Sequence, residues 1–175
     1  MTEFRYADET KDGRYVLVAS VHLTGSLAPA RRLMRDLTLP GQTRVHMRKE
    51  RDSRRRTIIS ALIAAGITAT IYDVGRYSHE LDARHDALSL LLADIDPTVT
   101  TRLTLEQDDS LLAWDRRALY DLARKHHLGQ AFTYDHQPAR TEPLLGIPDA
   151  IAWCWAKGGD WRRRLEPLIG EVRRP

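Results

Sequence analysis

Apolar and polar positions along the chain repeat with two different periods, and segments of the two kinds take turns. Alternating β-branched and aromatic positions predict strands, whereas stripes repeating every three or four residues predict helices. Residues 67–73 show the first pattern, and Ile58, Ile59 and Leu62 show the second. The predicted strands cover residues 4–10, 14–23, 43–47, 67–73, 101–106 and 130–134. The predicted helices cover residues 26–37, 52–65, 78–93, 110–125, 146–157 and 161–169.

The order of these elements predicts an α/β fold with a mixed sheet that opens with an antiparallel hairpin and has helices on both faces. Lys11-Asp12-Gly13 supplies the hairpin turn, Ser26 is expected to cap the first helix, and Gly66 to end the second. The chain has no internal repeat, low-complexity tract or Ser/Gly linker. We therefore expect a single domain spanning residues 1–175.

Composition fits a globular protein, since 42% of the residues are hydrophobic and 29% are charged. No apolar run is long enough to span a membrane, and the N-terminus lacks the apolar core of a secretory signal. Cys154 is the only cysteine, which excludes an internal disulfide and a cysteine-based zinc site. We expect a cytoplasmic protein with no membrane partner.

Basic residues are concentrated in short arginine-rich runs, although the net charge is only +3. Arginine forks match phosphate oxygens, so such runs are candidates for binding a nucleic-acid backbone. The alternative is a solvated helix face with no ligand. The candidate phosphate-binding residues are Arg48, Arg51, Arg54 and Arg55.

Four acids occupy positions where a ligand site could form. Asp8, Asp73 and Glu106 each follow a strongly β-like run, and Asp149 comes directly after Pro148 at the start of an apolar helix. If the strands run parallel, their acids emerge at one edge of the sheet, where α/β proteins bind ligands. Taken singly, acids commonly end strands or favour a helix N-terminus. Together they predict a shared site, because clustered carboxylates need a cation such as Mg²⁺ or Mn²⁺.

Five segments in order along the chain resemble the RNase H-like superfamily. More narrowly, they are similar to an uncharacterised bacterial family that opens with Asp-Glu-Ser-Gly and has a late Ala-Asp helix. The matching segments are Tyr6-Ala7-Asp8-Glu9-Thr10, Val45-His46-Met47, Ile71-Tyr72-Asp73, Leu103-Thr104-Leu105-Glu106 and Pro143-Leu144-Leu145-Gly146-Ile147-Pro148-Asp149-Ala150-Ile151-Ala152.

The resemblance implies an RNase H-like fold and a divalent-metal site built from Asp8, Glu106 and Asp149, with Asp73 or Glu9 nearby. Such a site would hydrolyse phosphodiester bonds of DNA or RNA, with Asp8, Asp73, Glu106 and Asp149 as the catalytic set. Glu106 stands where the family has Asp. A second interpretation therefore stays open: an inactive nucleic-acid-binding or protein-interaction module with the same fold.

Other chemistries lack their motifs. The seven histidines have no zinc-ligand spacing, and the chain contains no G-x-S-x-G elbow, P-loop or dinucleotide fingerprint. His46 and Glu9 are auxiliary candidates, His46 as a proton carrier or simply as a strand end. Trp153 is expected in the core, whereas Trp155 and Trp161 could also stack on bases.

Overall fold

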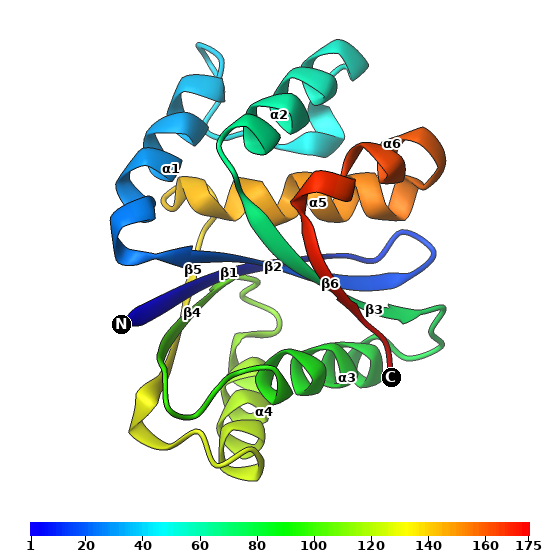
Figure 1. Ribbon diagram of the computed structural model, residues 1–175. Helices are drawn as coiled ribbons and strands as arrows, with labels where there is room; N and C mark the ends of the chain where they lie inside the picture. Colours follow the sequence, from blue (N-terminus) through cyan, green and yellow to red (C-terminus); the bar gives the residue numbers. More distant parts are fainter.

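The computed structural model describes residues 1–175 and is built around a twisted six-stranded sheet (Figure 1). Strand β2 runs antiparallel to its neighbours β1 and β3, and every other neighbouring pair is parallel. The strand order across the sheet is β5-β4-β1-β2-β3-β6. The strands are β1 (Thr2–Thr10), β2 (Tyr15–Leu23), β3 (Thr68–Gly75), β4 (Thr100–Glu106), β5 (Phe132–Gln137) and β6 (Ile169–Arg173). The predicted mixed α/β sheet with an opening antiparallel hairpin is confirmed.

Helices cover both faces of this sheet (Figure 1). One face carries α1 (Thr24–Leu37), α2 (Asp52–Ala64), α5 (Gly146–Lys157) and α6 (Gly159–Arg164). The other carries α3 (Glu80–Ala93) and α4 (Leu112–Lys125). Short 3-10 turns occur at Met47–Lys49, Gly129–Ala131, Pro143–Leu145 and Glu166–Leu168. None of the helices combines the length and the apolar character needed to cross a membrane.

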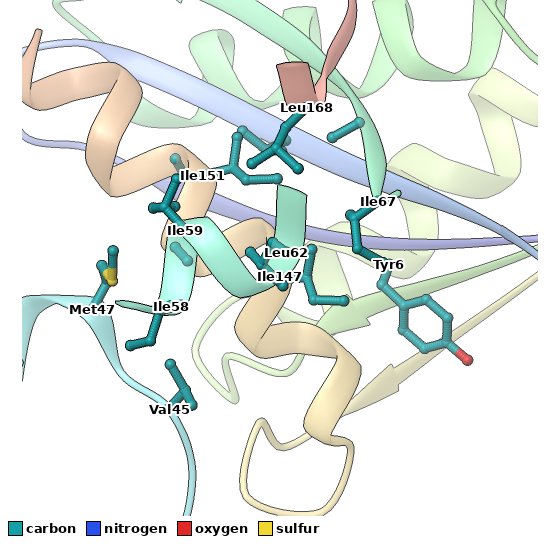
Figure 2. Close-up of a cluster of buried hydrophobic side chains, with 14 of the residues drawn as sticks. Tyr6, Val45, Met47, Ile58, Ile59, Leu62, Ile67, Ile147, Ile151 and Leu168 are labelled. Atoms are coloured by element: carbon teal, nitrogen blue, oxygen red, sulfur yellow. The ribbon is translucent and has the colours of Figure 1, made fainter. Parts of the chain in front are cut away.

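Each face of the sheet has its own hydrophobic core, because successive strand residues point to opposite faces. On β2, Val16 and Val18 join the core under α5, whereas Leu17 joins the core under α3 and α4. Figure 2 shows the first core, where Ile59 of α2 and Ile151 of α5 pack together above the sheet. The sheet is thus covered on each face by helices that pack on a separate hydrophobic core.

Two sequence predictions about the elements are wrong. Residues 43–47 do not form a strand but a loop that leads into a 3-10 turn. Val45 and Met47 are buried with a partly exposed residue between them, so a loop packed on α5 copies the alternation of a strand. The predicted helix over 161–169 ends at Arg164, and the unpredicted strand β6 starts at Ile169 and pairs with β3. Pro167 interrupts the helix between these two points.

The start of α1 also differs from the prediction. The helix begins at Thr24, two residues before Ser26, and Leu23 occupies the N-cap position. The Ser26 hydroxyl still serves the helix end, since it accepts from the Leu23 N–H at 3.1 Å and donates to the Leu23 carbonyl at 2.9 Å. Ser26 thus stabilises the first turn from inside it.

Candidate functional site

Parallel pairing of β1 and β4 brings two of the predicted acids together. Ala7 and Leu105 are the last paired positions, and Asp8 and Glu106 each follow directly. Ala7 and Leu105 lie in the core under α3 and α4, so the next residue of each strand points to the opposite face, toward α5. The two carboxyls are close enough for Glu106 to raise the pKa of Asp8. The predicted convergence of Asp8 and Glu106 is therefore present in the structure.

Asp149 faces this pair from the first turn of α5. Its Oδ2 accepts a hydrogen bond of 2.8 Å from the backbone N–H of Met47, which fixes the preceding loop against the helix. The three acids line one open cleft of about 580 Å³ that has no hydrophobic residue in its wall. The other residues of the wall are Glu9, Arg44, His46, Gln107, Asp108 and Asp109.

The electrostatics of the cleft favour protonation of its acids. Burial, followed by the charges of Glu9, Glu106 and Asp149 and the hydrogen bond with Glu106, raises the pKa of Asp8 well above its usual value. Burial raises the pKa of Asp149 to about 6, although the Met47 N–H and the charge of Arg44 act in the other direction. Asp8 has no ion-pair partner, and Arg44 approaches Glu106 only to 3.7 Å. The acids of the cleft are therefore short of positive charge.

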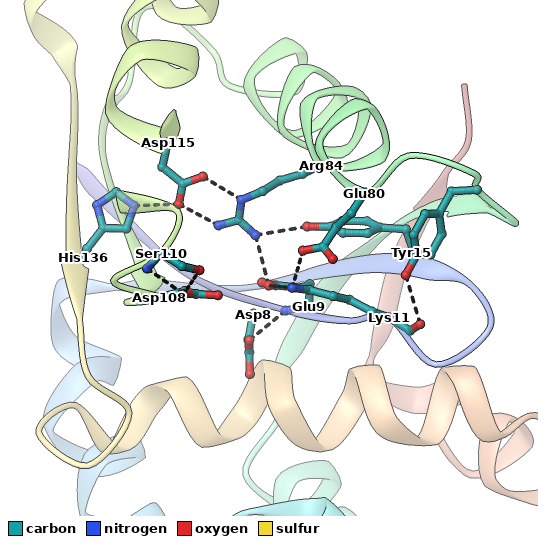
Figure 3. Close-up of polar contacts among 11 residues, drawn as sticks. Asp8, Glu9, Lys11, Tyr15, Glu80, Arg84, Asp108, Ser110, Asp115 and His136 are labelled. Carbon is teal, nitrogen blue, oxygen red and sulfur yellow. Dashed lines mark hydrogen bonds and ion pairs between the residues drawn. The ribbon is translucent and has the colours of Figure 1, made fainter. Parts of the chain in front are cut away.

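Glu9 points to the other face of the sheet, where it meets a buried ionic network (Figure 3). Arg84 of α3 contacts the Glu9 carboxylate at 3.0 Å and donates two hydrogen bonds of 2.6 and 2.7 Å to Asp115 of α4. His136 of β5 lies 3.0 Å from the second oxygen of Asp115. Burial alone would raise the pKa of Asp115, but hydrogen bonds from Arg84 and His136 lower it. The Glu9 carboxylate is thus bound by Arg84 on the opposite face of the sheet from Asp8, although its charge still contributes to the raised pKa of Asp8.

This network was missed in the sequence. Arg84 lies on the buried face of α3 with Ala87 and Leu88, and its side chain is almost completely buried. A charged residue on an apolar stripe is the signal that could have indicated a buried ionic partner. Asp115 gave no such signal, because an acid in the first turn of a helix is ordinary.

Asp73 does not join the other acids, contrary to the prediction. It lies on β3, and β2 separates that strand from β1. Arg14 donates to its two oxygens at 2.9 and 3.0 Å, and the indole N–H of Trp155 donates at 3.1 Å. The Asp73 side chain is fully buried and does not line the cleft. These contacts give it a structural role between β3 and α5.

Two of the four predicted phosphate-binding arginines are engaged within the protein. Arg54 donates to the Leu37 carbonyl, and Arg55 donates to the carbonyls of Met47 and Arg48. Arg51 is exposed, and Arg48 lines a second hollow that adjoins the cleft. Only these two remain available to a ligand.

The tryptophans are arranged differently from the prediction. Trp155 is the buried one. Trp153 is half-buried, lies 4.1 Å from the Arg55 guanidinium and makes an edge contact with Trp161 at 5.4 Å between ring centroids. Trp153 also lines the hollow beside Arg48. The residue expected in the core is thus the one that reaches the hollow.

Comparison with solved structures identifies the architecture. A crystal structure of a mutant protein of Bst-RNase HIII superposes on the chain with a TM-score of 0.54 and 10% sequence identity. The fold is RNase H-like. The superposition covers 86% of this chain and 50% of the other, so the chain spans about half the length of that ribonuclease. No protein-family model and no curated protein sequence matches the chain.

Within this RNase H-like fold, the carboxylate oxygens of Asp8 and Glu106 are donors of the kind that a hard divalent cation prefers. No group of three or more His, Cys, Asp or Glu side chains converges closely enough to form a complete metal-binding cluster. Mg²⁺, however, is often held by only one or two carboxylates, with waters and substrate phosphates as its other ligands. Asp8 and Glu106 supply two adjacent carboxyls without a compensating positive charge on Asp8. These two are the residues that could hold such an ion.

Proposed function

We propose that the protein is a metal-dependent nuclease that hydrolyses phosphodiester bonds of nucleic acid at Asp8, Glu106 and Asp149. The observation that carries the proposal is the buried, uncompensated Asp8 at the carboxyl end of β1, within reach of Glu106. Asp8 accepts a hydrogen bond of 2.8 Å from the Glu9 backbone N–H but has no ion pair. Burying a carboxylate without a neutralising cation is costly, so a site of this kind supports a cationic ligand. The RNase H-like fold supports the proposal at the level of architecture alone.

The three acids would have separate roles. Asp8 and Glu106 would hold Mg²⁺ or Mn²⁺, which when bound supplies a Lewis acid and lowers the pKa of bound water. Asp149 would orient the site from the α5 side, because its Oδ2 is held by the Met47 N–H while the rest of the carboxylate faces the cleft. Arg44 would limit the repulsion at Glu106. Asp73 has no part in this mechanism.

His46 is the proton carrier that we propose for the reaction. It lines the cleft together with the acids, and burial followed by the charges of Arg44 and Lys49 lowers its pKa. The imidazole is therefore neutral at neutral pH, so that it can accept a proton. Arg48, which lines the hollow that adjoins the cleft, and the exposed Arg51 would contact the phosphates of the strand. We place this activity in the cytoplasm, in keeping with the single, buried Cys154.

A substrate panel tests the proposal. Labelled single-stranded DNA, single-stranded RNA, duplexes and an RNA–DNA hybrid are incubated with the protein in Mg²⁺, in Mn²⁺ and in a chelator. We expect metal-dependent cleavage of at least one substrate and a loss of about 10²- to 10⁴-fold in Asp8→Asn, corresponding to several kcal/mol of transition-state stabilisation. Asp86→Asn, an exposed acid on α3 without an ion pair, is the matched control and should cleave normally. Equal cleavage by both variants would refute the proposal.

A second candidate function is nucleic-acid binding without hydrolysis. It is favoured by the hydrogen bond from Met47 to Asp149 and by the lack of a three-ligand cluster. Binding that weakens steeply with salt, with no cleavage of any substrate in either metal, would support this candidate over the nuclease.

A further inference from the structure

Another pocket, separate from the hollow beside Arg48, adjoins the acidic cleft. Arg44 lines both this pocket and the cleft. It measures about 350 Å³, within the size range of small-ligand sites. Its walls come from the end of α1, the loop that follows it, and the segment before α5. Met34, Val45 and Ala139 are buried and give it an apolar floor. The pocket could therefore hold a flat apolar group below a polar rim.

The rim of this pocket is positively charged. Arg35, Arg44 and Arg140 line it, and no Asp or Glu does. Arg35 and Arg140 are exposed and take part in no ion pair of the structure. The ion-pair partner of Arg44 is Glu106, which lies on the side of the acidic cleft. The pocket thus carries positive charge that no acid neutralises, whereas the acidic cleft on the other side of Arg44 carries negative charge.

Arg44 also carries an unused donor. Its Nη1 is buried and has no hydrogen-bond partner, and four-fifths of its side chain is removed from solvent, with 21% exposed. Buried donors without an acceptor are rare in native structures, so each one calls for an explanation. Arg44 therefore lines the pocket with a guanidinium whose hydrogen-bonding capacity the protein does not fully use.

The loop that forms the rim is held in place by side-chain hydrogen bonds. Gln42 accepts from the Leu39 N–H at 3.1 Å and donates to Glu50 at 3.2 Å. Thr38 donates from its hydroxyl to the Met34 carbonyl at 2.8 Å. Gly41 takes a φ of 85°, which suits glycine and lets the loop turn. The pocket is thus formed before any ligand arrives.

We propose that this pocket binds a phosphate-bearing nucleotide, with the phosphate on Arg35, Arg44 and Arg140 and the base on the apolar floor. Guanidinium forks bind phosphate oxygens well, and the floor provides the apolar surface that a base requires. The nucleotide could belong to a nucleic-acid strand or be free. Its placement next to a scissile phosphate rests on the proposed function, because Arg44 connects the pocket to Glu106.

Equilibrium binding in a chelator tests this pocket without any need for catalysis. The probes are a fluorescent short oligothymidylate and adenosine monophosphate, titrated at several salt concentrations. The pocket variant is the double change Arg35→Ala with Arg140→Ala. The control is the double change Arg32→Ala with Arg117→Ala, which removes two exposed, unpaired arginines from α1 and α4 outside the pocket. All four arginines are exposed, so both variants should fold normally, which thermal unfolding verifies.

We expect the pocket variant to bind the oligonucleotide at least about tenfold more weakly than the control. The slope of the logarithm of its binding constant against the logarithm of the salt concentration should also become shallower by about 1.4. This change corresponds to two lost phosphate contacts on a single strand. Loss of adenosine monophosphate binding as well would assign the pocket to free nucleotides, and loss of oligonucleotide binding alone would assign it to a strand. Equal binding by the two variants, or no binding of either probe by the unchanged protein, would overturn the proposal.

The outcome is separable from that of the nuclease proposal. If no substrate is cleaved but the pocket variant loses binding, the nuclease proposal fails and the pocket stands. If Asp8→Asn abolishes cleavage while the pocket and control variants bind alike, the pocket proposal fails and the nuclease stands.

Discussion

Two groups of acids lie on opposite faces of the sheet near the end of β1, and they differ in whether a buried arginine neutralises them. Asp115 and Glu9 share the buried guanidinium of Arg84, and the pKa of Asp115 is lowered. Asp8, one residue before Glu9, has no cation, and its pKa is raised. Of these two neighbours on one strand, Glu9 has an arginine that neutralises its charge, whereas Asp8 has none.

We propose that this difference separates the acids that serve the fold from those that serve a ligand. A buried carboxylate that has its arginine is satisfied and fastens α3, α4 and β1 together. A buried carboxylate without one costs stability unless a cation from outside binds it. Asp73 belongs to the first kind, since Arg14 and Trp155 satisfy it.

Removing Arg84, which neutralises Glu9 and Asp115, should have the largest effect on the stability of the fold. Arg84→Met removes the guanidinium and leaves Glu9 and Asp115 as neighbouring buried charges, so we expect a loss of about 3–5 kcal/mol in the free energy of unfolding. Chemical denaturation measures this loss. Arg117→Met, an exposed change on α4, is the control and should stay within about 0.5 kcal/mol. A loss under about 1 kcal/mol in Arg84→Met would show that the network does not hold the fold.

Removing the charge of Asp8, which no arginine neutralises, should raise the free energy of unfolding. In Asp8→Asn an uncharged amide replaces the raised-pKa carboxyl and can donate to Glu106. We expect the free energy of unfolding at about pH 8, without metal, to rise by about 1–2 kcal/mol. The same denaturation experiment reports it. Destabilisation by more than about 2 kcal/mol would mean that Asp8 is structural, like Asp115.

The smallest expected effect is a pH dependence carried by Asp149. Its pKa in the folded protein, about 6, lies above the value in the unfolded chain. The stability that its protonated form contributes is therefore present at low pH and lost as the pH rises through about 6.

We expect Asp149→Asn to gain about 1 kcal/mol over the unchanged protein between about pH 4 and pH 7, after allowing for solvent screening. The difference between the two proteins is the quantity to measure, because buried His22, whose pKa is lowered to about 4, affects both alike. A constant difference across this range would contradict the assignment.

The sequence predicted those parts of the site that follow from strand order. Asp8 and Glu106 directly follow the last paired residues of two parallel strands, so their meeting requires only the alternation of apolar residues and the rule that the carboxyl ends of parallel strands lie at one edge. Asp149 was placed by the start of its helix. The presence of the two acids at one level of the sheet could thus be inferred from local patterns.

What the sequence could not supply depended on non-local pairing. The insertion of β2 between β1 and β3, which removes Asp73 from the site, follows from the antiparallel hairpin only once the sheet is assembled. The contacts of Arg54 and Arg55 with backbone carbonyls depend on how a loop folds back on α2. Arginines that bind carbonyls and arginines that await a phosphate look alike in a sequence.

The most direct test of the account is a calorimetric titration of Mn²⁺ into the unchanged protein, Asp8→Asn and the control Asp86→Asn. The account predicts binding by the unchanged protein and the control, at least about tenfold weaker binding by Asp8→Asn, and proton release that accompanies binding near neutral pH. Proton release appears as a heat that changes with the ionisation enthalpy of the buffer, and it should vanish in Asp8→Asn. Equal Mn²⁺ affinity in all three proteins, or no binding by any, would contradict the claim that the uncompensated acids at the end of β1 form a cation site.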